Sequence, residues 1–275
     1  MRRNRMMNHI DKGQKKLAVL KKELQVIERK EEKLKKAAQK EATAWKKSLE
    51  SKIPPKVLGG LKKAFYSAFA TVFEKGISVI EKTYSVEERK ADHQILDYAL
   101  DIKGGRRELR KMQGNARKTD AKNMLLTTVE GVGLGALGVG IPDIVVFVGM
   151  LLKGIYETAL LYGFDYNQLK ERYLILKMME VSICKGEAWI DGNLQVEKLL
   201  RNMESQNITE ELFQQQMKNT AEVFATDLLV LKFVQGLPIV GIVGGAANPI
   251  YYKKVMNYVT LKYQKRYVVK KLKFH

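Results

Sequence analysis

The chain has 275 residues, a formal net charge of +19 at neutral pH and 45% hydrophobic residues, enough to build a core without covalent cross-links. Its single cysteine, Cys184, excludes a disulfide framework and a cysteine-based metal cluster, which is typical of a protein of the reducing cytoplasm. The basic N-terminus is followed by a charged helical pattern in place of the apolar stretch of a signal peptide, so we expect the chain to stay where it is made.

The excess positive charge lies at the two ends of the chain. Residues 1–63 carry 20 Lys and Arg against 7 Asp and Glu, residues 64–252 carry 21 against 23, and residues 253–275 carry 8 against none. Two stretches within the neutral part, 124–152 and 233–252, are almost free of charge and rich in glycine. Basic ends of this kind favour nucleic-acid phosphates or anionic lipid headgroups as partners.

A long basic amphipathic helix is predicted at the N-terminus. Apolar residues recur every three or four positions from Leu17 to Leu34, with Ala38 after them. Glu31 occupies one position of this narrow stripe, and lysines crowd the other faces. The spacing favours a solvated helix that leans on a partner helix; contact with a membrane surface or with nucleic acid are the alternatives.

A break after this helix is predicted at Pro54 and Pro55, because proline lacks the N–H group and clashes with the preceding turn. We therefore divide the chain into a basic N-terminal helix, residues 1–52, and a helical domain, residues 53–275. The domain opens with a helix that has a bulky aromatic face. The residues at helical spacing are Val57, Leu61, Ala64, Phe65, Ala68, Phe69, Val72 and Phe73.

Further helices are predicted downstream. Ser85 followed by Glu88 fits a capping box and begins a helix that ends before Gly104. Helical patterns also cover residues 167–184 and a stretch from Asn207 to about Gln235. No segment shows the alternation of a strand, so we predict an all-α fold: a multi-helix globular domain with two glycine-rich apolar segments and the long basic helix.

The first glycine-rich segment contains a GxGxxG match at Gly133, Gly135 and Gly138. A dinucleotide site would need a strand before these glycines and a helix opening directly after them, and the sequence offers neither. Pro142 and Asp143 fit instead the first turn of a helix, with Asp143 as its cap.

The helix that follows is apolar on most of its surface, so we predict a central position for it and an end at Gly163. Neither glycine-rich segment resembles a simple membrane span, because Glu130 interrupts the first and Pro238 the second. We expect a tight core or contact with the membrane interface. The candidate glycine-rich site comprises Gly133, Gly135, Gly138, Pro142, Asp143, Gly241, Gly245 and Asn248.

The C-terminal stretch from Lys253 interleaves basic residues with tyrosines and aliphatic residues. This pattern is shared by packing helices, by interfacial helices and by surfaces on which bases stack. The candidate residues for binding lipid or a partner are Lys253, Lys254, Tyr258, Lys262, Lys265, Arg266, Tyr267, Lys270 and Lys271.

Signals for catalysis are weak. His93, Asp97 and Asp101 share a helical stripe, for which a solvated polar face is favoured over a metal site. Glu130 and Asp143 bracket the first glycine-rich segment and would be the carboxylates of an unrecognised enzyme site. We predict no metal and no cofactor, and lean toward a protein that is not an enzyme.

The order and spacing of the structural residues resemble those of the EcsC protein family over roughly residues 45–272. The resemblance is specific in order but contains no catalytic signature. It rests on IPxKV at Ile53, the Ala64/Phe65 and Ala68/Phe69 pairs, FEKG at Phe73, IEKT at Ile80, Pro142 with Asp143, YGFD at Tyr162, and the Leu237 to Asn248 segment.

The resemblance implies a bacterial, mostly helical protein whose namesake is encoded beside an ABC transporter of the cytoplasmic membrane and has no assigned activity. We therefore expect a non-enzymatic protein, peripheral to the inner face of the cell membrane, that associates with anionic lipid or a membrane transporter. A nucleic-acid-binding protein that uses the basic ends is the alternative, and an enzyme with an unrecognised carboxylate site is the second alternative.

Overall fold

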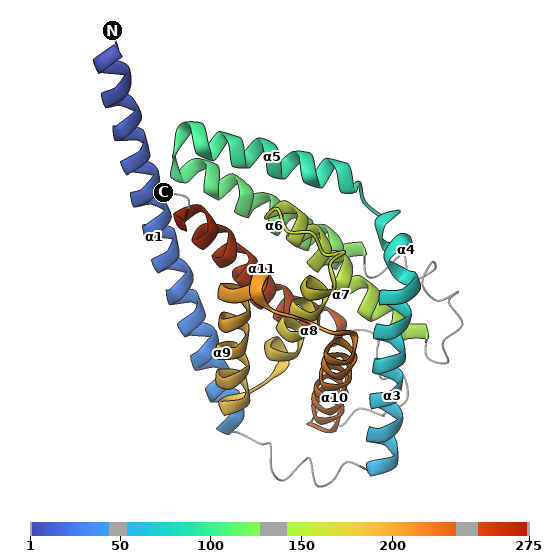
Figure 1. Cartoon of the computed structure of the whole chain (residues 1–275). Coiled ribbons are helices and arrows are strands. Elements are labelled where there is room, and N and C mark those ends of the chain that lie inside the picture. Colours follow the sequence, from blue (N-terminus) through green and yellow to red (C-terminus); the bar gives the residue numbers. More distant parts are fainter. Residues whose placement is uncertain (1, 44–53, 127–141, 235–246, 274–275) are drawn as a thin grey trace.

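The computed structural model describes residues 2–43, 54–126, 142–234 and 247–273, which form helices joined by short turns (Figure 1). No strand occurs in these ranges, and the predicted all-α fold is confirmed. The helices are α1 (Arg2–Thr43), α3 (Pro55–Thr71), α4 (Ile77–Glu81), α5 (Val86–Lys103), α6 (Arg106–Leu126), α7 (Pro142–Leu161), α8 (Leu169–Ile183), α9 (Gly186–Asn202), α10 (Glu210–Val234) and α11 (Ala247–Lys273).

Two helices, α7 and α11, lie at the centre of the bundle. α7 contacts α3, α5, α6 and α11, and α11 also contacts α1, α6 and α8. Among the described residues, α7 is the helix whose length and composition would suit a membrane span, yet 83% of its stretch Ile144–Leu161 is buried inside the protein. The central position predicted for the helix after Pro142 is therefore confirmed.

α7 and α11 run side by side in the same direction. Phe147 contacts Tyr251 with ring centroids 6.2 Å apart, and one helix length further on Tyr162 contacts Tyr267 at 6.0 Å. Both helices therefore begin at the same end of the bundle. Each begins within one of the two glycine-rich stretches, 124–152 and 233–252.

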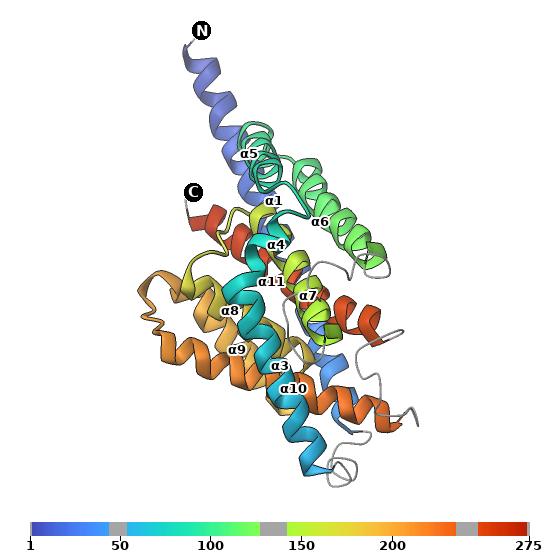
Figure 2. The same cartoon turned by 90° about the vertical axis from the view of Figure 1, so that its right-hand side faces the viewer.

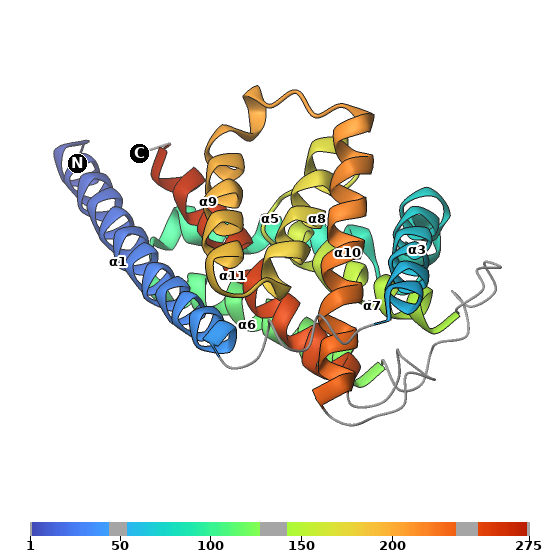
Figure 3. The same ribbon diagram turned by 90° about the horizontal axis from the view of Figure 1, so that it is seen from below.

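α1 lies along one side of the bundle, against α11 and α9 (Figures 1 and 3). Leu20 and Ile27 are fully buried, and Ala38 is nearly so. The predicted contact with a partner helix is thus confirmed from residue 20 to residue 38. The predicted domain boundary after residue 52 falls in 44–53, outside the described residues.

α5 and α6 form a hairpin along an edge of the bundle (Figure 2). The Ser85 hydroxyl accepts a hydrogen bond from the Glu88 N–H at 3.1 Å, as the capping pattern predicted. Gly104 ends α5 in the left-handed region with φ 58°, which glycine adopts without strain.

Three helices, the short α4 and the longer α6 and α9, were not expected from the sequence. The inner face of α6 carries few apolar side chains, chiefly Leu109 and Met112. The helical spacing of apolar residues is therefore weak in this part of the sequence. Gly186 follows the helical pattern that covers residues 167–184 and is the first residue of α9. With φ 59° it turns the chain between α8 and α9.

The start of α10 also differs from the prediction. The helix begins at Glu210, and its cap is Thr209, whose hydroxyl accepts from the Leu212 N–H at 3.3 Å. Asn207 lies two residues before this cap, in the connection from α9.

Gly163 gives a test of the junction after α7. Its φ of +78° is unfavourable for other residues, and a Cβ there would lie 2.3 Å from Nε2 of His93. We expect Gly163→Ala to lower the free energy of unfolding, measured by urea titration with circular dichroism, by roughly 1–3 kcal/mol.

Gly59→Ala is the matched control, because a Cβ there meets nothing within 4 Å. In the second turn of α3 this change should stabilise the protein by about 0.5–1 kcal/mol. Equal effects of the two substitutions would contradict the described junction.

Candidate functional site

The basic C-terminal stretch forms α11, and most of its candidate side chains are engaged inside the protein. Tyr258, Lys262 and Tyr267 are buried, whereas Lys253 and Lys270 are exposed. This placement is that of a packing helix, one of the three alternatives for this stretch, because its neighbours bring carboxylates and amides to the basic and tyrosine side chains.

Lys262 lies at the centre of an ion-pair cluster that joins three helices. Its Nζ is 2.6 Å from Glu31 of α1 and 2.5 Å from Glu197 of α9, and its side chain is fully buried. Lys265 pairs with the same two carboxylates at 2.7 and 2.9 Å. Glu31, the polar residue in the apolar stripe of α1, therefore pairs with two lysines of α11.

The electrostatics of this cluster favour the charged forms. Burial acts to raise the pKa of Glu197, but Lys262 and Lys265 more than offset it and hold the pKa at about 2. Burial acts to lower the pKa of Lys265, and hydrogen bonds to Glu31 and Glu197 raise it above its usual value.

A second ion pair ties α11 to α8. The Arg266 guanidinium donates to both oxygens of Glu171 at 2.7 and 2.8 Å and lies 3.9 Å from the ring centre of Phe164. The Tyr263 hydroxyl donates to the same carboxylate at 2.8 Å. Glu171 is buried, so these donors satisfy a charge that water does not reach.

The polar stripe of α5 makes a third set of contacts with α11. Tyr267 donates to Asp97 at 2.6 Å, and Lys271 pairs with Asp97 at 2.7 Å and with Asp101 at 3.0 Å. His93 bonds through Nδ1 to the carbonyl of Leu161 at 2.9 Å. The expected solvated face of α5 is therefore wrong for His93 and Asp97, which face α7 and α11.

Two further candidates on α11 contact neighbouring helices. Lys254 pairs with Glu41 of α1 at 2.9 Å, in an exposed position. The Tyr258 hydroxyl donates to Asn193 of α9 at 2.8 Å.

The candidate glycine-rich site lies largely outside the described residues. Pro142 and Asp143 are the first residues of α7, as predicted, and Asn248 lies in the first turn of α11. Gly133, Gly135, Gly138, Gly241 and Gly245 fall in the undescribed ranges, and so does Glu130.

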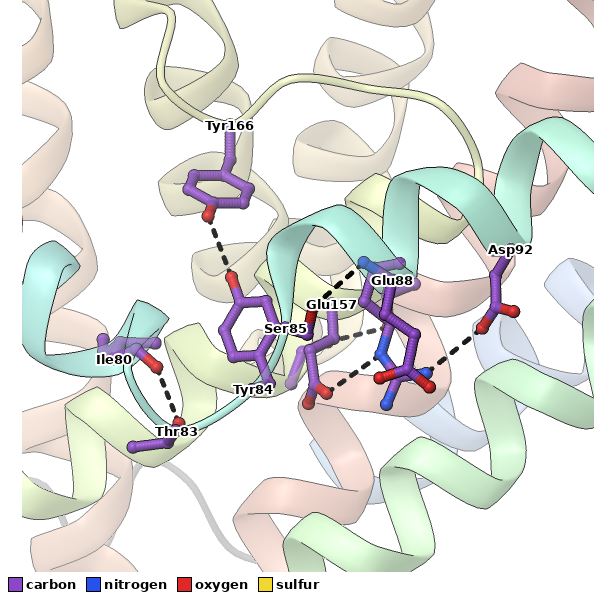
Figure 4. A network of polar contacts seen from close by, with 11 residues as sticks. Ile80, Thr83, Tyr84, Ser85, Glu88, Asp92, Glu157 and Tyr166 are labelled. Atoms are coloured by element: carbon purple, nitrogen blue, oxygen red, sulfur yellow. Dashed lines mark hydrogen bonds and ion pairs between the residues drawn. The ribbon is translucent and has the colours of Figure 1, made fainter.

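A tyrosine network connects the α7–α8 loop with the α4–α5 turn (Figure 4). The hydroxyls of Tyr84 and Tyr166 are 2.9 Å apart, and Tyr166 donates to Glu81 at 2.6 Å. Arg89 reaches Glu157 at 3.3 Å beside them. Burial raises the pKa of both tyrosines, so these phenols are structural hydrogen-bond donors and are not poised to lose a proton near neutral pH.

A cavity of about 290 Å³ lies between α1, α6 and α11. Its polar lining consists of cationic and neutral side chains: Lys30, Lys33, Gln113, Tyr162, Asn257, Thr260 and Gln264. No carboxylate belongs to this lining, so the cavity offers no general base of the Asp or Glu type.

Exposed basic residues gather where the N-terminal half of α1, the α5–α6 turn and the end of α11 meet (Figures 1 and 3). Asp101 joins the three, because it pairs with Lys16 at 2.6 Å and with Lys271 at 3.0 Å. Glu108, the acidic residue in the first turn of α6, is buried. We call this surface the basic pole: Lys15, Lys103, Arg106, Arg107, Arg110, Lys111, Lys270 and Lys273.

Sequence reasoning missed the contribution of α6 to this pole. The signal was present in the run GGRRELRK, where four basic residues follow two glycines. Of the nine candidates on α11, Lys270 belongs to the basic pole, and Lys253 is exposed near the opposite end of the helix.

Lys262 allows a test of the buried cluster. Lys262→Met would leave the half-buried carboxylates of Glu31 and Glu197 with Lys265 as their remaining partner, so we expect a loss of about 1–3 kcal/mol in the free energy of unfolding. Lys36→Met, on the exposed face of α1, should change it by less than about 0.5 kcal/mol. Equal urea midpoints for the two variants would contradict the cluster.

The lowered pKa of Glu197 predicts that the free energy of unfolding depends on pH. Its pKa is lowered from 4.5 to about 2 on folding, so its stabilising contribution is present above pH 4.5 and is lost as the pH falls toward 2. Across this window the urea midpoint should fall more steeply for the unaltered protein than for Glu197→Gln. Parallel profiles would show that Glu197 is not paired.

The model of the EcsC protein family matches residues 19–268. The match begins within α1, earlier than residue 45, where the resemblance began in the sequence. Most of α1 therefore belongs to the family fold, in agreement with its packing on α11.

Protein EcsC of Bacillus subtilis (strain 168) is 28% identical to this chain over 168 residues. The aligned part covers 59% of this chain and 66% of that protein, just under two thirds of its length. No solved structure matches this chain. Since the family model spans helices α1 to α11, the chain belongs to the EcsC protein family.

Proposed function

We propose that this protein is a non-enzymatic helical protein that attaches to the inner face of a bacterial membrane, where it contacts anionic lipid or a membrane transporter. The observation that carries this proposal is the basic pole. Its eight exposed Lys and Arg side chains lie at one end of the molecule. The membrane location implied by the family resemblance supports the same assignment.

The strength of such a surface comes from the sum of its charges. A basic residue close to an anionic bilayer contributes about 1 kcal/mol, within roughly one Debye length of the surface. The ion pairs of Lys262, Lys265 and Arg266 keep much of the charge of α11 away from any external anion. Attachment therefore depends on α1 and the α5–α6 turn more than on α11 alone.

Polar groups of the described helices argue against catalysis as the main role. The carboxylates Glu31, Glu171 and Glu197 are each held by Lys or Arg, and they join helices. Nucleic acid would be attracted to the same pole by the same phosphate chemistry, so it is the control in the following experiment.

We expect the unaltered protein to co-sediment with phosphatidylglycerol-containing vesicles and not with pure phosphatidylcholine vesicles. Changing Arg106, Arg107 and Arg110 together to Gln should weaken anionic binding on the order of 100-fold, because three contributions of about 1 kcal/mol are lost. The matched control changes the exposed Lys56, Lys63 and Lys218 to Gln, which alters the net charge equally but lies away from the basic pole.

Equal losses in the two triple variants would show that net charge alone governs binding and would contradict a defined pole. Salt-sensitive binding to DNA or RNA without binding to anionic vesicles would replace the membrane by nucleic acid as the partner.

A further inference from the structure

α5 exposes large hydrophobic side chains along a single face. Ile95 is 66% exposed, Tyr98 69% and Ile102 50%. Their spacing of three and four residues places them in one continuous stripe. The other large hydrophobic residues exposed in the described chain, Leu194, Leu212 and Ile250, lie singly on three different helices.

The position of α5 explains why this stripe has no partner among the described residues. α5 lies at the edge of the bundle and packs against α6, α7 and part of α1 (Figures 1 and 2). Its inner face carries the buried Leu100 together with Asp97, which accepts from Tyr267. The stripe therefore lies on the face that points away from the core, and the fold does not require it to be apolar.

Basic residues flank the stripe where α5 ends. Lys103 is the last residue of α5, and Arg106 and Arg107 begin α6 after the glycine turn. Asp101, the acidic residue beside Ile102, is paired with Lys16 and Lys271. An apolar stripe with a tyrosine, bordered by Lys and Arg, matches the chemistry of the bilayer interface, where aromatic rings lie at headgroup depth and cations meet phosphates.

We propose that the last two turns of α5 dock this protein on an anionic bilayer, with Ile95, Tyr98 and Ile102 entering the interface and the adjacent basic pole contacting headgroup phosphates. This inference rests on the proposed membrane attachment and specifies the surface that makes it. The charges of the pole draw the protein to the membrane, and the stripe gives a contact that salt does not screen.

The test changes Ile95, Tyr98 and Ile102 together to Gln, a residue that helices tolerate well. Binding to vesicles of equal phosphatidylglycerol and phosphatidylcholine is measured at low and at high salt. We expect the unaltered protein to keep part of its binding at high salt and the stripe variant to lose that part, a loss of at least about tenfold in affinity.

The matched control changes Leu194, Leu212 and Ile250 to Gln, three hydrophobic residues outside α5 that are 47–62% exposed. Its binding at both salt concentrations should remain within about twofold of the unaltered protein. Far-ultraviolet circular dichroism and the Tm of each variant show whether it is folded.

A single substitution gives an independent readout that leaves the stripe largely intact. Tyr98→Trp should show a blue-shifted emission with anionic vesicles, and brominated lipid should quench it beyond the quenching of the unaltered protein, which contains Trp45 and Trp189. No additional quenching would place α5 away from the bilayer and overturn the inference, even if the triple variant failed to fold.

The outcomes separate the two proposals. Vesicle binding that depends on Arg106, Arg107 and Arg110 but not on the stripe would overturn docking through α5 and leave membrane attachment in place. If the unaltered protein sediments as a dimer and the stripe variant as a monomer, with equal binding to vesicles, then the stripe binds a second copy of this chain and docking through α5 is overturned. Failure of the unaltered protein to bind anionic vesicles would overturn both proposals.

Discussion

The architecture depends on neutralising the cations that α11 carries into the core. A buried ammonium group is tolerated only when carboxylates and hydrogen bonds replace its water, and Lys262 meets this requirement through Glu31 and Glu197. Those carboxylates come from α1 and α9. In the same way, Arg266 forms an ion pair with Glu171 of α8. α11 therefore organises its neighbours through paired charges as well as apolar packing, and α1 is held against it as part of the fold.

This arrangement separates two uses of positive charge within one chain. The cations of α11 that are paired with Glu31, Glu171 and Glu197 stabilise the interior. The side chains of the basic pole lie on the outside, where the acidic residue Asp101 is already engaged by two lysines. In a protein of net charge +19, the basic pole places a cluster of exposed cations next to an exposed hydrophobic stripe, and this combination supports a membrane surface as the partner.

Features set by local sequence could be predicted, and those set by distant partners could not. The apolar period of α1, the cap at Ser85 and the start of α7 at Pro142 each follow from residues close together in the chain. The fate of Lys262 depends on Glu31, which is 231 residues away. The basic residues at the start of α6 could not be recognised from the net charge of residues 64–252, because acidic residues elsewhere in this range balance them in the sum.

Hydrogen exchange measured by mass spectrometry, with and without anionic vesicles, tests the division between paired core charges and the basic pole most directly. The account predicts slow exchange along residues 20–38 of α1 and 251–268 of α11 under both conditions. Vesicles should slow exchange further only around residues 95–111. Rapid exchange of α1 in the free protein, or a vesicle effect centred on α11, would contradict the account.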